Sequence, residues 1–362
     1  MRVLVWQWGR FGGAPRFAAA LAQAIGSLPG TEAVLSLSSG AELLHSKAPP
    51  YCDLPVATYR GQVGFALRAT GAPFAVRGLA RRIRALRPDL AVCAQPGLLD
   101  LLMVAALRRL RVPFVVLVHD ADAHPGDGLP LQMWLQRALC RRAAAVGALT
   151  AHVGERLRAQ GLAGTSSRKL LPLSHPPVAF DVPPRRPGPD NAQHLLSFGR
   201  LLPYKGLDLL AKALALLGPV PGLVVRVVGS GPESPTLDAL RALPGVTVEN
   251  RWVPEDEIGS LLGWSDALVL PYRESSQSGV AAAALAAGRR VLATRVGGLE
   301  EQLADAPGAI LCEPDAASLT TGLRRLLDAL RDTAVLPAVD PREAWRDLAA
   351  SLMRQIEALR LQ

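Results

Sequence analysis

Short apolar runs alternate with helix-like segments along the whole chain, and this alternation constrains the fold more than any other feature. The first part has apolar runs at residues 3–6, 90–93, 113–118 and 145–149, with helix-like segments between them. Strands that alternate with helices favour a parallel sheet covered on both faces. The 362 residues, 49% of them hydrophobic and 20% charged, are enough for two α/β domains.

A Pro-rich polar segment interrupts the alternation. Six prolines and two arginines fall within residues 176–190, a composition typical of a linker. Further apolar runs follow it, at residues 194–199, 223–228, 246–248, 267–270 and 291–293. We therefore expect an N-terminal Rossmann-like domain over residues 1–180, a C-terminal Rossmann-like domain over 191–338 and a final helix over 339–362. Apolar residues of the final part recur at helical spacing: Trp345, Leu348, Leu352, Ile356 and Leu359.

Positive charge is concentrated in the first half. Residues 1–190 contain 23 Lys and Arg against 11 Asp and Glu, a net +12, whereas residues 191–362 contain 17 against 20, a net −3. Such a field favours an anionic ligand or surface. Nucleic acid is not the expected partner, because the basic residues are not interleaved with aromatic ones and no nucleic-acid-binding motif is present.

Arginines crowd one short segment of the first half: Arg77, Arg81, Arg82, Arg84 and Arg87. Apolar residues recur between them at helical spacing: Val76, Leu79, Ile83 and Leu86. The pattern predicts an amphipathic helix. Two interpretations are open, a peripheral contact with anionic membrane and a solvated face over an ordinary core helix.

The cysteines indicate a reducing compartment. Cys52, Cys93, Cys140 and Cys312 are far apart, and no pair has the spacing of a metal site or a disulfide framework. No apolar stretch approaches the roughly 18 residues that a membrane span needs, and the N-terminal run is too short for a signal peptide. We expect a cytoplasmic protein, with a peripheral contact to the inner face of the membrane as a further hypothesis.

Glycines follow the first predicted strand. Gly9, Gly12 and Gly13 precede a helix, and bare backbone with helix N-terminal amides can bind an anion. A turn or packing role fits the pattern equally well. The spacing is not G-x-G-x-x-G, so a dinucleotide-dependent dehydrogenase is not expected.

Two cations follow the apolar run at 194–199. Arg200 and Lys205 are five residues apart and precede a helix that starts near Gly206. Such a loop can direct both cations at one diphosphate. A solvated loop with a capping glycine would show the same residues.

A polar cluster follows the run at 267–270. Gln277, Ser278, Gly279 and Val280 lead into an Ala-rich helix, and this edge of an open α/β sheet is where ligands bind. The amides at the helix start can hold phosphate. The alternative is a helix start that is merely capped by Ser278.

Two histidines and two aspartates follow the run at 113–118. His119, Asp120, Asp122 and His124 could ligate a metal, hydrogen-bond a substrate or satisfy their own loop. The spacing is that of a loop and no further ligand cluster is evident, so a metal site is the least favoured of the three.

Five segments within residues 194–301 resemble, in order and spacing, the family 4 glycosyltransferases of the GT-B fold. They are Phe198-Gly-Arg followed by Lys205-Gly-Leu-Asp, then Val227-Val-Gly-Ser-Gly-Pro, Val253-Pro-Glu-Asp-Glu, Ser265-Asp-Ala-Leu-Val-Leu-Pro-Tyr, and Val296-Gly-Gly-Leu-Glu-Glu. The first half resembles the family more loosely, through Gly12-Gly13 and His119-Asp120. The resemblance covers essentially the whole chain and is strongest in its second half.

The sequence departs from the family at one point. The family commonly carries two glutamates separated by seven residues, which by position would be Ser275 and Ala283 here. Glu274 is one residue away from the first, and the second glutamate, which usually holds the ribose hydroxyls, is absent. A run beginning at Gln277 resembles a sub-branch of the family with the sequence QSGV.

The resemblance implies two facing Rossmann-like domains with a cleft between them, and a final helix that packs back on the N-terminal domain. It implies a retaining, metal-independent transfer of a sugar from a UDP- or GDP-linked donor, without a cofactor. The acceptor would be a glycan, a lipid-linked molecule or a small molecule, as in the synthesis of cell-surface polysaccharides and glycoconjugates.

The resemblance also implies residue roles. The candidate catalytic residues are His119 and Glu274, and Gly12 and Gly13 form the candidate acceptor and phosphate loop. The candidate donor-binding residues are Arg200, Lys205, Gly229, Gln277, Ser278, Gly279, Val280 and Glu301. Two other classes share the fold and stay open, a catalytically impaired nucleotide-sugar-binding protein and a sugar-nucleotide epimerase.

Overall fold

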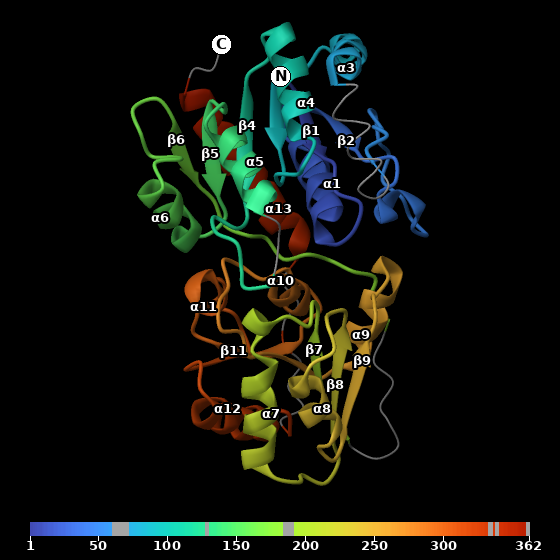
Figure 1. Ribbon diagram of the computed structural model, residues 1–362, viewed down its shortest axis with the longest axis vertical. Helices are drawn as coiled ribbons and strands as arrows, with labels where there is room; N and C mark the ends of the chain where they lie inside the picture. Colours follow the sequence, from blue (N-terminus) through green and yellow to red (C-terminus); the bar gives the residue numbers. More distant parts are fainter. Residues whose placement is uncertain (60–71, 127–129, 184–191, 332–335, 337–339, 360–362) are drawn as a thin grey trace. The chain divides into compact units, whose positions relative to one another are not determined.

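The computed structural model describes residues 1–59, 72–126, 130–183, 192–331, 336 and 340–359 (Figure 1). The Pro-rich residues 184–191 lie outside this described part. The chain divides into two compact units. Unit 1 comprises Met1–Ala123, Gly128–Ser174 and Arg342–Gln362, and unit 2 comprises His124–Asp127 and His175–Pro341.

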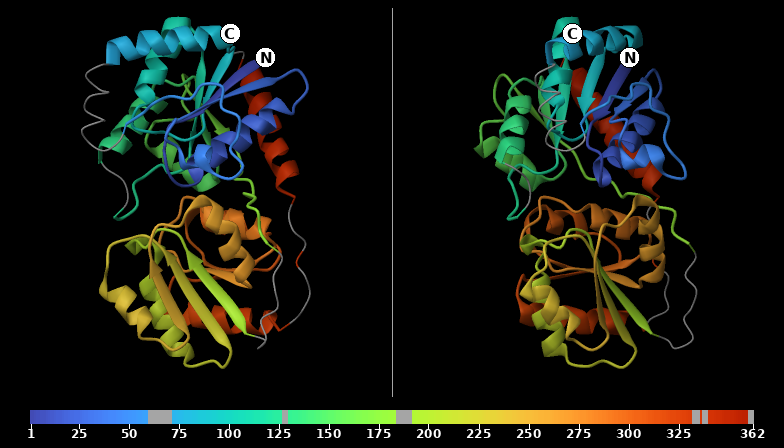
Figure 2. Two further views of the ribbon diagram at one scale, coloured as in Figure 1. Left: turned by 90° about the vertical axis from the view of Figure 1, so that its right-hand side faces the viewer. Right: turned by 45° about the vertical axis from the view of Figure 1, so that its right-hand side comes forward.

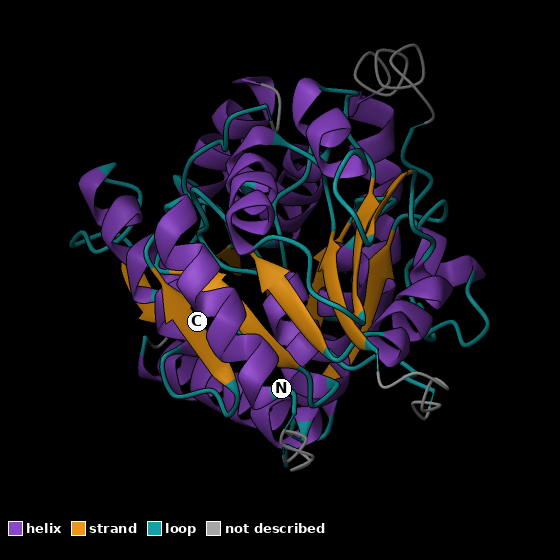
Figure 3. Ribbon diagram, turned by 90° about the horizontal axis from the view of Figure 1, so that it is seen from below, coloured by secondary structure: helices purple, strands orange, loops and turns teal. Residues whose placement is uncertain are grey.

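Unit 1 is built on a parallel sheet of six strands in the order β2-β1-β3-β4-β5-β6. The strands are β1 (Arg2–Gln7), β2 (Glu32–Leu37), β3 (Leu90–Cys93), β4 (Phe114–Val118), β5 (Ala145–Ala148) and β6 (Lys169–Pro172). The helices are α1 (Gly13–Gly26), the 3-10 turn η1 (Glu42–His45), α3 (Ala72–Leu86), α4 (Asp100–Leu110), α5 (Pro130–Cys140), α6 (Ala151–Ala159) and α13 (Pro341–Ala358). Figure 3, seen from below, shows parallel strands flanked by helices.

Strands of unit 1 are apolar on both faces because both faces are covered. Four consecutive residues of β1, from Val3 to Trp6, are fully buried, and so are the β4 residues from Val115 to Val118. Such continuous runs are typical of parallel sheets. The predicted α/β fold is confirmed in this unit.

Unit 2 repeats the architecture with the strand order β12-β11-β10-β7-β8-β9. Its strands are β7 (Gln193–Phe198), β8 (Leu223–Gly229), β9 (Val246–Asn250), β10 (Ala267–Leu270), β11 (Arg290–Thr294) and β12 (Ala309–Cys312). Its helices are η2 (Pro203–Lys205), α7 (Leu207–Leu217), α8 (Pro235–Arg241), η3 (Glu255–Glu257), α9 (Ile258–Trp264), α10 (Gly279–Ala286), α11 (Gly297–Leu303) and α12 (Ala316–Ala329). Two apolar cores lie against its sheet, one containing Leu195 and Val227 and the other Leu196 and Val228. Neighbouring residues thus face opposite cores, as the pleat requires.

The last helix, α13, packs within unit 1 (Figure 2). Its Trp345 ring lies 4.9 Å from the ring of Phe17 on α1, nearly edge to face. Near its other end, Gln355 Nε2 donates to the carbonyl oxygen of Pro172 at 3.0 Å. The apolar residues at helical spacing therefore bury one stripe of α13 in unit 1.

None of the helices in the described part is long and apolar enough to cross a bilayer. All strands of each sheet run parallel, so their carboxyl ends lie at one edge. Ligands of open α/β sheets bind at that edge.

Candidate functional site

Three glycines bring the loops at the carboxyl edge of unit 2 into backbone contact. A Cβ on Gly229 would lie 1.6 Å from the carbonyl oxygen of Gly199, and one on Gly206 would lie 1.8 Å from that of Pro271. Gly231 is similarly confined, since a Cβ on it would lie 2.3 Å from the carbonyl oxygen of Leu201. No side chain fits at these positions, so the ends of β7, β8 and β10 converge on a small area.

Both candidate phosphate-binding cations lie against tyrosines in this area. Lys205 Nζ is 3.7 Å from the centre of the Tyr272 ring and 5.0 Å from that of Tyr204. Arg200 Nη2 donates to the Tyr204 hydroxyl at 3.0 Å. Burial raises the pKa of Tyr272 to about 12, so its ring is neutral at pH 7. The tyrosines bring the two cations together and fix their direction.

The N-terminus of α10 lies beside these cations. Val280 Cγ2 would be 3.7 Å from a Cβ on Gly199, so the helix start adjoins the end of β7. Ser278 is the N-cap, and its hydroxyl accepts from the amide of Ala281 at 3.1 Å. A Cβ on Gly279 would meet nothing within 4 Å, so the helix start borders open space.

One predicted amide donor is already engaged. Gln302 Oε1 accepts from the amide of Ser278 at 2.9 Å, and Gln302 Nε2 donates to the carbonyl oxygen of the same residue at 3.0 Å. The amide of Ser278 is therefore engaged within the protein in this structure, and its contact with phosphate stays a prediction. The amides of Gly279 and Val280 donate to no acceptor among the described residues, and the positive end of the helix favours an anion there.

Amide side chains hold two of the loops, and the sequence did not reveal them. The side chain of Gln302 hydrogen-bonds both the amide and the carbonyl oxygen of Ser278. The side chain of Asn250 hydrogen-bonds the amide and the carbonyl oxygen of Gly231 in the same way, with both distances 3.0 Å. Nothing in their sequence context marks Asn250 or Gln302 as loop supports, because the partners are backbone groups that only folding brings near.

The positions of the two family glutamates hold no carboxylate. Ser275 is buried and its hydroxyl donates to the carbonyl oxygen of Gln277 at 2.9 Å. Ala283 is buried within α10. Glu274 is half exposed, and one of its oxygens lies 3.5 Å from His124 Nδ1. The ring of His124 stacks on Tyr204, with centres 4.7 Å apart.

The remaining donor candidates lie at the rim. Glu301 is exposed on α11, and Gln277 is half buried in the loop that precedes α10. Among all donor candidates, the structure therefore brings Arg200, Lys205 and the start of α10 together most closely.

At the carboxyl edge of unit 1, the glycine turn is open. Gly12 has φ +79° and a Cβ on it or on Gly13 would meet nothing within 4 Å. Residue 12 requires glycine because its backbone φ is positive, and not because neighbouring atoms leave no space for a side chain. The start of α1 is therefore accessible to a ligand.

His119 lies at the same edge of unit 1 and is neutral. Its side chain is almost fully buried, and burial lowers its pKa. Nε2 lies 2.9 Å from the carbonyl oxygen of Ala94. Because a carbonyl oxygen only accepts, Nε2 carries the hydrogen. The ring of Phe17 packs edge-on against the imidazole at 4.7 Å, so the ring orientation is fixed.

The His and Asp side chains after β4 do not converge. Asp122 is paired with Arg156 at 2.7 Å and accepts from Gln160 at 2.9 Å. His119 bonds to Ala94, and His124 belongs to unit 2. Within the described part of the chain, no three His, Cys, Asp or Glu side chains are grouped as metal ligands.

Comparison with known proteins gives the family. The family model "Glycosyl transferases group 1" matches residues 192–329, and "Glycosyltransferase Family 4" matches residues 11–168. The chain is 29% identical to a 2-deoxystreptamine glucosyltransferase of Streptomyces kanamyceticus over 62% of its own length and 63% of the relative's. It is 36% identical to D-inositol 3-phosphate glycosyltransferase 2 of Catenulispora acidiphila over 39% of its length and 36% of the relative's. Both matches span less than two thirds of the relative.

A solved structure shares the fold over the full length. The structure of Anabaena Alr3699/HepE in complex with UDP-glucose superposes with a TM-score of 0.67 and 17% identity, covering 100% of both chains. At this identity the likeness concerns the fold alone. The two family models together cover most of the sequence. The chain therefore belongs to the family 4 glycosyltransferases, the group 1 glycosyl transferases, and it has the GT-B fold.

Proposed function

We propose that this protein is a retaining, metal-independent glycosyltransferase that takes a sugar from a nucleotide-sugar donor bound by unit 2. The observation that carries the proposal is the convergence of Arg200, Lys205 and the open start of α10. In the transfer, the bond between the sugar C1 and the diphosphate oxygen breaks, and C1 bonds to an acceptor hydroxyl oxygen with its configuration retained. Nucleoside diphosphate and the acceptor's proton leave.

The charge on the departing diphosphate is what the site has to stabilise. Two cations and the amides of Gly279 and Val280 supply that stabilisation without a metal ion, and preorganised donors of this kind contribute several kcal/mol. The tyrosines and Gln302 hold these groups before substrate arrives, which limits reorganisation during the reaction. UDP or GDP is the proposed nucleotide.

His119 and Glu274 have separate proposed roles. A neutral His119 with a fixed ring is suited to hydrogen-bond the reacting sugar and not to supply a positive charge. Glu274, half exposed at the loop after β10, is proposed to orient the donor sugar. His119→Ala should lose much more turnover than donor affinity; unchanged turnover would leave His119 a structural residue.

The acceptor is proposed to bind unit 1, at the open start of α1 around Gly12 and Gly13. A glycan, a lipid-linked molecule or a small molecule fits the basic character of this half, and the proposed role is the synthesis of cell-surface polysaccharide or glycoconjugate. The names of the two relatives refer to 2-deoxystreptamine and D-inositol 3-phosphate.

We also propose a peripheral contact between α3 and anionic membrane at the inner face of a cytoplasmic membrane. The apolar stripe of α3 is buried in unit 1, with Ile83 fully buried and Val76 and Leu79 nearly so. The four arginines of the helix and Arg87 directly after it are exposed, and Phe74 at its start is 77% exposed. The contact is therefore electrostatic, at about 1 kcal/mol per basic residue near the surface.

Flotation with vesicles tests the membrane contact. The protein should float with anionic vesicles at low salt, and salt or the triple variant Arg81→Glu, Arg82→Glu, Arg84→Glu should release it. Indifference to anionic vesicles at low salt would exclude the contact.

The function is tested with a panel of UDP-, GDP- and ADP-sugars. One donor should stabilise the protein by about 2.7–4 kcal/mol at 100–1,000 times its dissociation constant. The same donor should be consumed faster when an acceptor is present. Isomerisation of the donor sugar without an acceptor would indicate an epimerase instead, and binding without any turnover would indicate a nucleotide-sugar-binding protein.

A further inference from the structure

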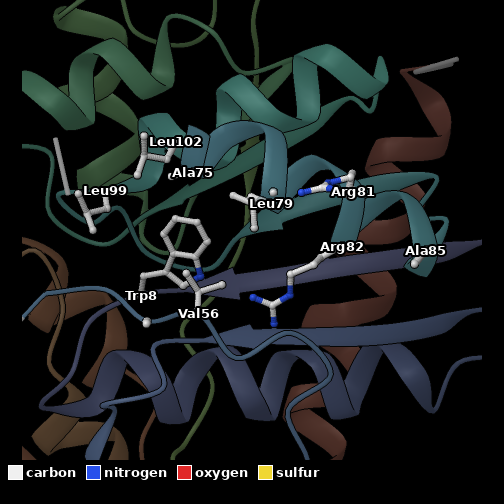
Figure 4. A pocket seen from close by; sticks show the side chains of 11 residues that line it. Trp8, Val56, Ala75, Leu79, Arg81, Arg82, Ala85, Leu99 and Leu102 are labelled. Carbon is white, nitrogen blue, oxygen red and sulfur yellow. The ribbon is translucent and has the colours of Figure 1, made fainter. Parts of the chain in front are cut away.

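Unit 1 contains a pocket of about 690 Å³ that none of the predicted site residues lines. Its wall is mainly apolar and includes Trp8, Leu79, Leu99 and Leu102. Figure 4 shows the Trp8 indole in the middle of the lining, with Leu99 and Leu102 on one side and Leu79 on the other. This volume is in the range of small-molecule sites.

The pocket is elongated along one face of α3. Ala75, Gly78, Arg82 and Ala85 all line it, and their spacing of three or four residues places them on one side of the helix. From Ala75 to Ala85 the helix rises about 15 Å. Three of these four residues are small, which leaves the length of the helix face free for a chain-like apolar group.

Arginines give the pocket a charged rim. Arg81 and Arg82 are both lining residues and both exposed. Arg82 Nη2 donates to the carbonyl oxygen of Pro55 at 2.8 Å, which fixes its position beside Val56 (Figure 4). Arg81 forms no ion pair with any residue of the described part of the chain. A cation beside an apolar pocket suits the anionic head of an amphiphile.

The pocket begins at the sheet edge where the candidate residues of unit 1 lie. Trp8 directly follows β1, and Leu99 lies in the loop after β3. Ala94, which accepts the hydrogen bond from His119, begins that same loop. A ligand whose chain occupies the pocket would therefore have one end close to the carboxyl edge of unit 1.

We infer that this pocket binds the apolar chain of an anionic amphiphile, with the phosphate or carboxylate head at Arg81. This inference does not rest on the proposed glycosyltransferase function.

Calorimetric titration of the full chain tests the pocket directly. Decyl phosphate should bind, decanol should bind about tenfold more weakly, and inorganic phosphate should show no heat at the same concentrations. Equal binding of inorganic phosphate and decyl phosphate would overturn the inference, because the apolar chain would then contribute nothing.

Gly78→Leu is the sharpest variant. Gly78 lines the pocket, an added Cβ there meets nothing within 4 Å, and a helix interior favours leucine over glycine. The variant should keep or raise its thermal midpoint and bind decyl phosphate at least about 100-fold more weakly. Arg77→Leu, which adds a leucine to the exposed face of the same helix, is the matched control and should bind like the wild type.

Arg81→Ala should weaken the binding of decyl phosphate about fivefold to tenfold and leave the affinity for decanol unchanged. Arg84→Ala, an exposed arginine outside the lining, should change neither. Wild-type affinity of Gly78→Leu for decyl phosphate would place the ligand elsewhere and overturn the inference.

Discussion

The two units repeat one architecture but treat the carboxyl edge of the sheet in opposite ways. In unit 2 the loops after β7 and β8 close much of the edge: Gly206, Gly229 and Gly231 have no room for a single carbon, and amide side chains hold the loops, while Gly279 at the start of α10 borders open space. In unit 1 the turn after β1 leaves the edge open: Gly12 and Gly13 have free space around them. Rigid loops suit a ligand that is the same in every turnover, and free space suits a ligand that differs between relatives.

Charge follows the same division. In unit 2, a hydrogen bond from Arg273 lowers the pKa of Asp208, and one from Arg251 lowers the pKa of Glu257. In unit 1, burial raises the pKa of Asp100, at the start of α4, to about 7. Arginines thus pair with these two acidic groups of unit 2, whereas unit 1 buries one carboxyl whose contacts include the amide of Gly97 at 2.7 Å and the thiol of Cys93 at 3.4 Å.

The largest expected effect is a loss of stability in the closed edge. Gly229→Ala places a carbon in the carbonyl of Gly199 at a backbone φ of +156°, and should cost about 3–5 kcal/mol in urea unfolding. Gly13→Ala, the counterpart in the open edge, should stay within about 0.5 kcal/mol. Similar costs for the two variants would contradict the distinction between the edges.

The buried carboxyl of unit 1 predicts a pH dependence of opposite sign to that of ordinary acids. Because the folded pKa of Asp100, about 7, lies above the unfolded value, its contribution is fully present below about pH 4 and is lost as pH rises through 7. The loss amounts to about 4 kcal/mol. For Asp208 and Glu257, whose pKa values are lowered, stability is instead lost as the solution becomes acidic.

Asp100→Asn tests this pH dependence. The free energy of unfolding in urea should be measured from about pH 4.5 to about pH 7.5, a range that spans the unfolded and folded pKa values. It should vary less with pH in this variant than in the wild type. Exposed Asp305→Asn is the control and should reproduce the wild-type profile. A wild-type profile in Asp100→Asn would mean that the buried carboxyl does not titrate with unfolding.

Charge removal in unit 2 should affect chemistry more than stability. Lys205→Ala and Arg200→Ala should each lower turnover by about 10²–10³-fold, since each removes a group that stabilises the departing diphosphate. Arg109→Ala, which removes an exposed arginine of α4 in unit 1, should leave turnover unchanged. Near-normal turnover in both unit 2 variants would show that the diphosphate binds elsewhere.

Chelation should have the smallest effect. Excess EDTA should leave the initial rate within about twofold, because protein cations and amides take the place of a metal, and Asp122 is occupied by Arg156. Loss of activity with EDTA and its recovery with one metal ion would restore the metal interpretation of the residues after β4.

The fold could be predicted because its signals are local. Apolar runs such as those of β1, β4 and β10 are long enough to be recognised, and the glycines and cations that follow them lie at fixed distances along the chain. β2, β6 and β12 escaped prediction. In β6 only Leu171 is buried, in β12 only Cys312 is buried, and the Glu32 start of β2 is exposed, so their apolar signals are weak.

The candidate site could be predicted only in part. Arg200, Lys205 and Gly279 were identified because they follow strand ends in a recognisable order. Their supports were not identified: Tyr204 and Tyr272 contact the cations across the fold, and Gln302 occupies the Ser278 amide from 24 residues away. Such contacts have no periodicity, and the same residue types are common on protein surfaces.

By itself, the sequence determined the strand and helix order, the uneven charge of the two halves and the family, because each depends on residue types and spacings along the chain. Only the tertiary structure decided which amide of the α10 start is engaged, which glycines tolerate no side chain, and that the small residues of α3 border a pocket beside Trp8. These properties depend on distances between segments remote in sequence, which hydrophobic patterning brings together without specifying the atoms that meet.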